Sequence, residues 1–424
     1  ATVLAPAIRA AEEGFAADAH LLSEMQDLAA VLAERPARGR HFSEMWRVLF
    51  HEGKLQAGDI VRNPLQARAL RLIAEQGTAA FYEGEIAQAI AHSVQAENGP
   101  ITRADLAAYE PRITTPLRGN FRGHELLLMP PPSSGGVAMV AALGILESRL
   151  EEAPLPAQAS PEFLHLLAEA LKHAFADRAE WLADDAFVEV PVARLTSEAY
   201  IKTLADRFDP ARVLPDRFAY GSVSPEQPAA AVDGGTSHFS IVDAAGMAVA
   251  CTETLNTACG SLVEVPGFGF LLNNQMDDFT TMPGAPNAYG LRQSDRNLPA
   301  PGKRPLSSMS PTIVVQDGAV KMVSGGSGGP RIITSTIQTI LNVLLFDLSV
   351  QQAVAQPRVH HQWVPEVLLL EPGLDMAPLT QALQVRGHIL ETEESIGTVQ
   401  AVVVGEGRLH PASDPRKGVG PAGY

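Results

Sequence analysis

Apolar residues recur at helical spacing through most of the first 181 residues, and this period predicts a helix-rich first half. The clearest case is 160–181, where Leu164, Leu167 and Leu171 fall on one face of the expected helix. The helices that this pattern predicts are 6–14, 20–34, 64–76, 79–94, 102–106, 137–150 and 160–181, with two short strands at 113–117 and 125–129.

From residue 236 onward, apolar and polar positions alternate, as is typical of strands. Strands 236–243 and 247–254 are joined by a turn, and Asp317-Gly318 predicts a second hairpin. Helices followed by paired strands predict an α+β fold with two stacked sheets covered by helices on both sides. No fixed-period repeat and no separate second domain is visible. The other elements expected here are strands 312–315, 320–323, 367–370 and 399–404 and helices 331–346, 349–356 and 378–385.

The entry into the first of these strands has unusual chemistry. Residues 210–233 are rich in Pro, Ser and Asp, which predicts an exposed, mobile linker that leads to Gly234-Gly235-Thr236. Two glycines permit backbone conformations that other residues resist, so the Thr236 hydroxyl could attack the preceding carbonyl in an N→O acyl shift. The freed amine of Thr236 would then be the base for its own hydroxyl. On these three residues alone, a plain loop entering a strand is the commoner interpretation.

Composition argues against several classes of partner. The 424 residues carry a net charge of −16, whereas binding to nucleic acid requires clustered Lys and Arg. No apolar run approaches the roughly 20 residues that span a bilayer. The spacing of Cys251 and Cys259 matches no metal-binding motif, and two cysteines make no disulfide framework. The histidines His238, His360 and His361 have no further ligand residue at the spacing of a metal site. We therefore expect no metal, no cofactor and no membrane partner, and we interpret these histidines as structural.

Long and specific motifs occur over nearly the whole chain. They are 101–106 (ITRADL), 130–136 (PPPSSGG), 254–257 (TLNT), 271–279 (LLNNQMDDF), 303–312 (KRPLSSMSPT), 328–333 (GGPRII) and 412–416 (ASDPR). Together with Gly235-Thr236 they resemble the γ-glutamyltransferase (γ-glutamyltranspeptidase) family. The resemblance implies an N-terminal-nucleophile hydrolase with a four-layer αββα sandwich of mainly antiparallel sheets.

The resemblance also implies a reaction. The enzyme would cleave the γ-glutamyl amide of glutathione-like compounds and pass the γ-glutamyl group to water or to an amino-acid or peptide acceptor. Thr236 would be the nucleophile, released by self-cleavage at Gly235-Thr236. Thr254 matches a threonine whose hydroxyl lies near the nucleophile, although without the match it is an ordinary β-branched strand residue. Gly328 and Gly329 match the glycines whose bare amides form the oxyanion hole.

The γ-glutamyl group has an amine and a carboxylate on its α-carbon, so its recognition needs one acidic or accepting group for the amine and one donating group for the carboxylate. Asn256, Gln275 and Asp278 match the positions that hold the α-amine. Asp278 would supply the counter-charge, since charge-assisted hydrogen bonds are roughly twice as strong as neutral ones. Ser307 and Ser308 match the pair that donates hydroxyls to the α-carboxylate. As isolated motifs, these segments would be taken for turns or loops.

Residues 283–290 resemble the lid loop of the family, with Tyr289 at the position of the lid tyrosine. A lid would exclude water and favour transfer over hydrolysis. The alternative is a Pro-rich surface loop of no special function.

The chain enters the family pattern downstream of an Asp-Phe-Arg-Glu segment, whose arginine pairs with the substrate α-carboxylate, and of a glycine-rich run before it. Nothing here matches either, so no arginine is assigned this role. The helical pattern after Ala1 lacks the succession of basic, apolar and small residues that marks a signal peptide. We therefore expect this chain to be a piece of a longer precursor, shortened at its N-terminus relative to the family. Cleavage would give a large portion, 1–235, and a small catalytic portion, 236–424, paired in one interlocked domain. The family is typically periplasmic or extracellular, but the sequence leaves the compartment open.

Three hypotheses follow. The leading one is a self-cleaving γ-glutamyltransferase and glutathione hydrolase. The second is an acylase of the same superfamily that acts on glutaryl or cephalosporin-type amides. Asp278 and Asn256 argue against it, because a glutaryl group has no α-amine to hold. The third is an uncleaved, inactive relative that acts as a binding protein. The unmatched arginine of the Asp-Phe-Arg-Glu segment favours the third hypothesis. Without its charged hydrogen bond to the α-carboxylate, substrate binding would be weaker by about 1.5–3 kcal/mol.

Overall fold

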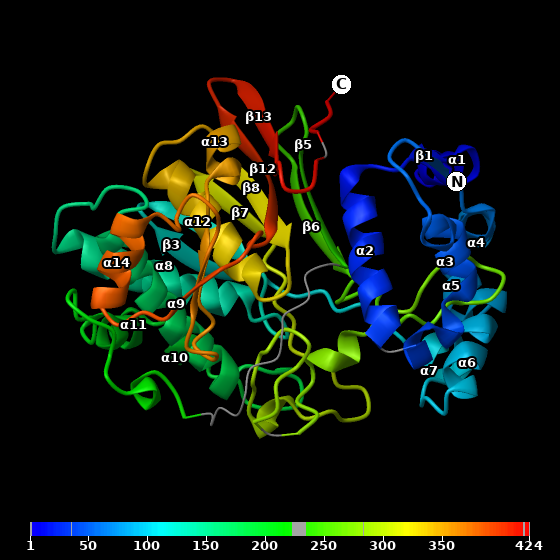
Figure 1. Cartoon of the computed structure of the whole chain (residues 1–424), viewed down its shortest axis with the longest axis horizontal. Coiled ribbons are helices and arrows are strands. Elements are labelled where there is room, and N and C mark those ends of the chain that lie inside the picture. The colour runs from blue at the N-terminus through cyan, green and yellow to red at the C-terminus, as the bar shows by residue number, and fades with distance from the viewer. Residues whose placement is uncertain (1, 35, 223–234, 283, 419, 424) are drawn as a thin grey trace. The chain divides into compact units, whose positions relative to one another are not determined.

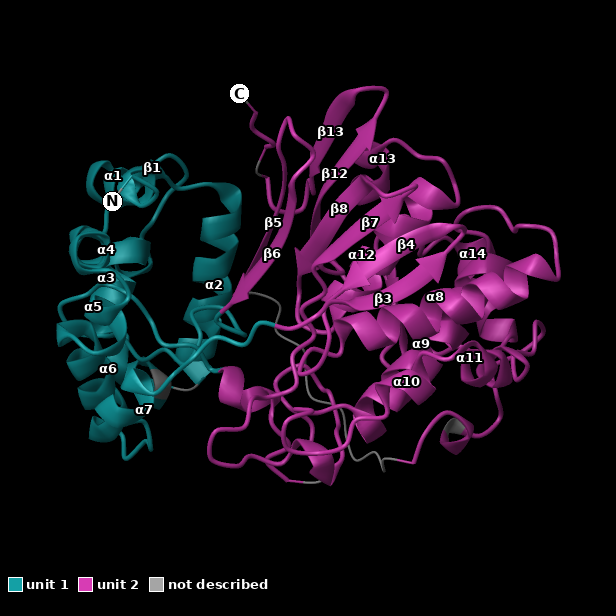
Figure 2. Cartoon of the chain, turned by 180° about the vertical axis from the view of Figure 1, so that it is seen from behind, with its two compact units in different colours: residues 1–113, 255–274 teal, residues 114–254, 275–424 magenta. Residues whose placement is uncertain are grey.

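The computed structural model describes every residue except 1, 35, 223–234, 283, 419 and 424. The chain divides into two compact units, shown in Figure 2. Unit 1 is 1–113 with 255–274, and unit 2 is 114–254 with 275–424. The predicted linker lies in part outside the described residues, as does Gly234. These units differ from the predicted cleavage products, 1–235 and 236–424, which stay a prediction.

Unit 1 is mainly helical and is held together by two small apolar clusters. Helix α4 begins at Pro64 behind Asn63, whose side chain accepts a hydrogen bond from the first turn. In the first cluster, the rings of Phe42 and Phe50 pack 6.3 Å apart. The elements are α1 (Ala5–Glu13), α2 (Ala19–Glu34), α3 (Ser43–Phe50), α4 (Pro64–Gln76), α5 (Ala79–Tyr82), α6 (Glu85–Ala96), α7 (Arg103–Ala107), β1 (Phe15–Ala16) and β2 (Ile60–Val61).

Unit 2 is built on a six-stranded antiparallel sheet of order β13-β12-β8-β7-β4-β3. The predicted turn between β7 and β8 is present, and both Asp317 and Gly318 have positive φ, as a tight hairpin turn requires. The strands are β3 (Leu117–Phe121), β4 (His124–Leu128), β7 (Thr312–Gln316), β8 (Ala319–Ser327), β12 (Thr398–Gly405) and β13 (Arg408–Ser413).

Helices cover one face of this sheet, and a second, two-stranded sheet packs on the other (Figures 1 and 2). The second sheet is the antiparallel hairpin of β5 (Thr236–Val242) and β6 (Ala248–Thr254), which contacts β8 and β12. The predicted α+β class with stacked antiparallel sheets is therefore confirmed. The helices of unit 2 are α8 (Gly135–Glu151), α9 (Pro161–Trp181), α10 (Val192–Leu195), α11 (Glu198–Ala205), α12 (Arg331–Leu344), α13 (Val350–Ala355) and α14 (Ala377–Val385). A small third sheet is formed by β9 (Val359–His360), β10 (Leu368–Leu370) and β11 (Leu390–Thr392).

Several expected elements were wrong in their bounds, including the strand expected at 320–323, which is β8 and runs to Ser327. The helix predicted at 79–94 is two helices, α5 and α6, because Gly84 ends the first and precedes the second. The strand predicted at 113–117 begins only at Leu117, since Pro116 has no amide to donate and the turn at Arg122-Gly123 sets the pairing of β3 with β4. Among the described residues, no helix combines the length and apolar content needed to cross a bilayer.

Candidate active site

The predicted nucleophile is the first residue of β5, and it pairs in register with the last residue of β6. Thr236 is 4% exposed, and its Oγ1 lies 2.8 Å from Thr254 Oγ1. Thr254 Oγ1 also donates to the carbonyl oxygen of Gly235 at 3.2 Å. Because a hydroxyl has one proton, this donation leaves Thr254 as the acceptor of the Thr236 proton. The Thr236 carbonyl in turn accepts a hydrogen bond from Lys417 Nζ at 2.8 Å.

Gly235 has φ +84, in the region that favours glycine. The peptide bond predicted to be cleaved, between Gly235 and Thr236, thus follows a residue in a backbone conformation that most residues resist. The Gly235 carbonyl oxygen already accepts a hydrogen bond from the hydroxyl pair of Thr236 and Thr254.

The side chain of His238 makes hydrogen bonds within the β5–β6 hairpin and packs against the main sheet. Its Nδ1 lies 2.7 Å from Thr252 Oγ1, and its Nε2 lies 3.1 Å from Ser240 Oγ. The ring lies so close to Gly325 of β8 that a Cβ there would meet it at 2.4 Å. Burial lowers the pKa of His238 to about 4, so the ring is neutral at physiological pH.

The two predicted oxyanion glycines join β8 to α12. Gly328 and Gly329 have φ values of 128 and 57, and the Gly328 carbonyl accepts a hydrogen bond from the Arg331 amide at the start of α12. The Tyr289 ring packs directly on Gly329, where a Cβ would lie 2.5 Å from a ring carbon. The structure thus brings the predicted lid tyrosine, which is buried, onto one of the predicted oxyanion residues.

The predicted acidic residue lies at the end of a 3₁₀ turn, Gln275–Asp278. The Asp278 carboxylate is 6% exposed and accepts hydrogen bonds from the side chains of Gln275 and Asn287, the latter at 3.0 Å. Burial raises the pKa of Asp278 to about 7, and the positive charge of Arg178 opposes this rise. A cationic ligand beside this buried carboxylate would favour its charged form.

The predicted serine pair adjoins the segment 130–136 on one side and a buried arginine on the other. Ser307 pairs with Ser133, and its carbonyl accepts hydrogen bonds from the Ser134 amide at 2.8 Å and hydroxyl at 2.7 Å. Ser308 Oγ accepts a hydrogen bond from Arg178 Nη2 at 3.2 Å.

Sequence reasoning missed Arg178. It lies on α9, which is buried on nearly all sides, from Phe163 to Ala179. A cation within such a helix is costly unless it is paired, and this was the signal that could have drawn attention to it.

A family comparison decides what these residues belong to. The family model for Gamma-glutamyltranspeptidase matches residues 1–424. The chain belongs to this family.

Sequence relatives support the assignment. The chain is 40% identical over 416 residues to "Glutathione hydrolase proenzyme" of Escherichia coli (strain K12), with 98% of this chain and 70% of that protein covered. It is 41% identical over 424 residues to the protein of the same name from Pseudomonas aeruginosa, with 99% and 72% covered. The predictions of the family and of an enzyme made as a proenzyme are confirmed.

A solved structure shows the fold. "Crystal structure of cephalosporin acylase from Bacillus halodurans" has a TM-score of 0.81 at 24% identity, with 97% of this chain and 72% of that chain covered. At this identity, the likeness concerns the fold alone, and it confirms the predicted sandwich.

One predicted site residue of this gamma-glutamyltranspeptidase family member, Asn256, lies in unit 1. It is 4% exposed, has φ 77, and its Nδ2 donates to the Asn274 carbonyl at 3.3 Å. Its predicted contact with a substrate amine stays a prediction.

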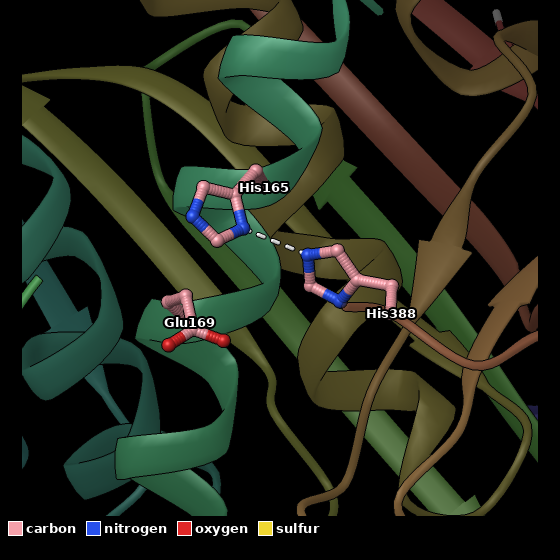
Figure 3. A group of neighbouring side chains, drawn as sticks. All are labelled: His165, Glu169 and His388. Carbon is pink, nitrogen blue, oxygen red and sulfur yellow. Dashed lines mark hydrogen bonds between the residues drawn. The ribbon is translucent and has the colours of Figure 1, made fainter. Parts of the chain in front are cut away.

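A second group of reactive side chains lies in the core of unit 2 (Figure 3). His165 and Glu169, one turn apart on α9, meet His388, and the three offer ligand atoms within 4.8 Å of one another. His165 Nδ1 lies 2.7 Å from His388 Nε2. Lys172 Nζ lies 3.1 Å from Glu169 Oε1, and the Tyr220 hydroxyl donates to the other oxygen. The ammonium group also lies 2.5 Å from Glu366 Oε1, and its positive charge opposes binding of a metal ion, so we interpret this group as a buried polar network rather than a metal site.

Proposed function

We propose that the chain is a γ-glutamyltransferase and glutathione hydrolase that cleaves itself between Gly235 and Thr236. The observation that carries the proposal is the hydroxyl relay at this peptide bond, Thr236 to Thr254 to the Gly235 carbonyl oxygen. Membership of the Gamma-glutamyltranspeptidase family and the relatives named glutathione hydrolase support the substrate class.

Self-cleavage follows from this relay. Thr236 Oγ1 attacks the Gly235 carbonyl carbon while its proton passes to Thr254 Oγ1, and Thr254 passes its own proton to the carbonyl oxygen. The charge that develops on this oxygen is thereby neutralised. The carbon–nitrogen bond then breaks and the Thr236 amine takes up the proton, which leaves an ester between Gly235 and Thr236 Oγ1. Water hydrolyses the ester, giving a Gly235 carboxylate and a Thr236 with both a free amine and a free hydroxyl.

The same hydroxyl then acts on the substrate. The free amine removes its proton as Oγ1 attacks the γ-carbonyl carbon of a γ-glutamyl amide. The amides of Gly328 and Gly329 would stabilise the oxyanion, since no Cβ stands in the way. The leaving amine takes the proton, and the γ-glutamyl ester on Thr236 is passed to water or to the amine of an amino acid or peptide.

The substrate α-carbon would be held between opposite charges. The Asp278 carboxylate, fixed by Gln275, faces the ammonium group. Ser307 and Ser308 donate to the carboxylate. Tyr289, packed on Gly329, would close over the reacting atoms.

A comparison of two chromogenic anilides tests this function. A glutaryl anilide has the same carbonyl and carboxylate as a γ-glutamyl anilide but lacks the amine. We expect kcat/KM to be about 10- to 150-fold higher for the γ-glutamyl compound, the range that one charged hydrogen bond gives. Faster turnover of the glutaryl compound would favour the acylase hypothesis, and turnover of neither would favour the inactive relative.

The pH dependence of this ratio reports on Asp278. Because burial raises its pKa to about 7, the carboxylate is protonated as the pH falls from 7 to 5 and loses its attraction for the substrate ammonium. The kcat/KM ratio of γ-glutamyl to glutaryl anilide should therefore fall by up to about tenfold per pH unit below 7. Taking the ratio cancels ionisations common to both reactions. A ratio that does not change over this range would contradict the assignment of Asp278.

A further inference from the structure

The site contains a buried cation with no role in the proposal so far. Arg178 is 1% exposed, and it reaches from α9 to Ser308, one of the two predicted carboxylate-binding serines. Burial lowers the pKa of Arg178 to about 10, and the charge of Asp278 opposes this fall, so the guanidinium is charged at neutral pH.

Three nitrogens of this guanidinium have different surroundings. Nε donates to Ser134 Oγ at 3.0 Å, and Nη2 donates to Ser308 Oγ at 3.2 Å. Nη1 is buried and makes no hydrogen bond to any of the residues that the structure describes. A buried charged donor without a hydrogen-bond partner is costly, and an anionic ligand beside it would remove that cost.

The arginine also fixes the direction of the serine protons. A guanidinium only donates, so each serine oxygen bonded to it must accept, and its own proton points elsewhere. Ser134 shows the result, because its hydroxyl donates onward to the Ser307 carbonyl at 2.7 Å. For Ser308, no acceptor of the hydroxyl proton is found in the described part of the chain. Its proton is thus available to a ligand.

We propose that Arg178 is a positioning residue for the substrate α-carboxylate: it holds Ser308 as a donor and places a positive charge behind the serine pair. This inference rests on the proposed function. With Asp278, it sets a negative and a positive group in one buried site, matching the ammonium and carboxylate on the substrate α-carbon. The two charges would therefore fix which way round the α-carbon binds.

The experiment uses three anilides that separate the two charges. The γ-glutamyl compound has both groups, the glutaryl compound only the carboxylate, and the 4-aminobutyryl compound only the amine. We expect Arg178→Met to lower kcat/KM by about 10- to 100-fold for the two substrates with a carboxylate, mainly through KM. Turnover of the 4-aminobutyryl compound should change less than threefold, and Arg178→Lys should recover part of the loss.

Two controls distinguish this from a structural role. Ser134→Ala removes the Nε contact that holds Arg178 and should give a smaller loss, again confined to the two substrates with a carboxylate, whereas a merely structural arginine would give equal losses for all three. Arg408→Met, an exposed arginine at the start of β13, should change none. Equal losses for all three anilides in Arg178→Met would overturn the proposal. If that variant does not fold, Arg178→Lys replaces it, with a smaller loss expected that is again confined to the two substrates with a carboxylate. If the wild-type chain turns over none of the anilides, the proposed function fails, and this inference fails with it.

Discussion

Replacing Thr236 by alanine is expected to leave one uncleaved chain and to reduce turnover of a γ-glutamyl anilide by about 10⁴-fold or more. The variant lacks the oxygen that attacks the Gly235 carbonyl, and it lacks the nucleophile for the substrate. A denaturing gel with intact-mass measurement reports the first loss, and the anilide assay reports the second. Thr236→Ser retains a hydroxyl and should retain both functions in part.

Ser237→Ala is the matched control, because the neighbouring serine is exposed on the opposite face of β5 and should be silent in both assays. A Thr236→Ala protein that is still cut before residue 236, or that keeps wild-type turnover, would show that another group performs these steps.

Replacing Asp278 by asparagine is expected to lower kcat/KM for the γ-glutamyl anilide by about 10- to 150-fold, while the glutaryl anilide changes little. Asparagine keeps the shape and one acceptor oxygen, but it removes the negative charge that attracts the substrate ammonium. The pH dependence of the ratio between the two substrates should disappear in the same variant, since the carboxyl assigned to the substrate amine is no longer there to titrate. Steady-state kinetics at several pH values measures both effects.

Asp317→Asn provides the control for charge removal. This aspartate lies in the exposed turn between β7 and β8, where asparagine also tolerates positive φ. It should leave both substrates unaffected. If Asp278→Asn lowers turnover of the two anilides equally, the residue supports the fold of the site and does not select the amine.

Elements with local signals could be predicted from the sequence. Ser160-Pro161 begins α9 at the expected residue, and the helix expected at 102–106 is α7, whose N-cap residue Thr102 forms a capping box with Asp105. The pairing of Thr236 with Thr254 also follows from the short turn that joins their strands. In each case, the residues that decide the structure are close in sequence.

Contacts between distant segments could not be predicted in this way. Arg178 lies 130 residues before Ser308, and its helical pattern gave only the period of a buried helix. His165 and His388 are separated by 223 residues, so sequence spacing alone did not indicate that they meet. Packing of helix on sheet determines such pairs, and no local propensity encodes it.

The central claim is that one hydroxyl, on Thr236, performs both self-cleavage and substrate cleavage. Acid quenching of the protein during turnover of a γ-glutamyl anilide, followed by intact-mass and peptide mapping, tests both steps together. We predict a fragment that begins at Thr236 and carries one γ-glutamyl group on that residue. A fragment with a different first residue, or a γ-glutamyl group attached to any other side chain, would contradict the account.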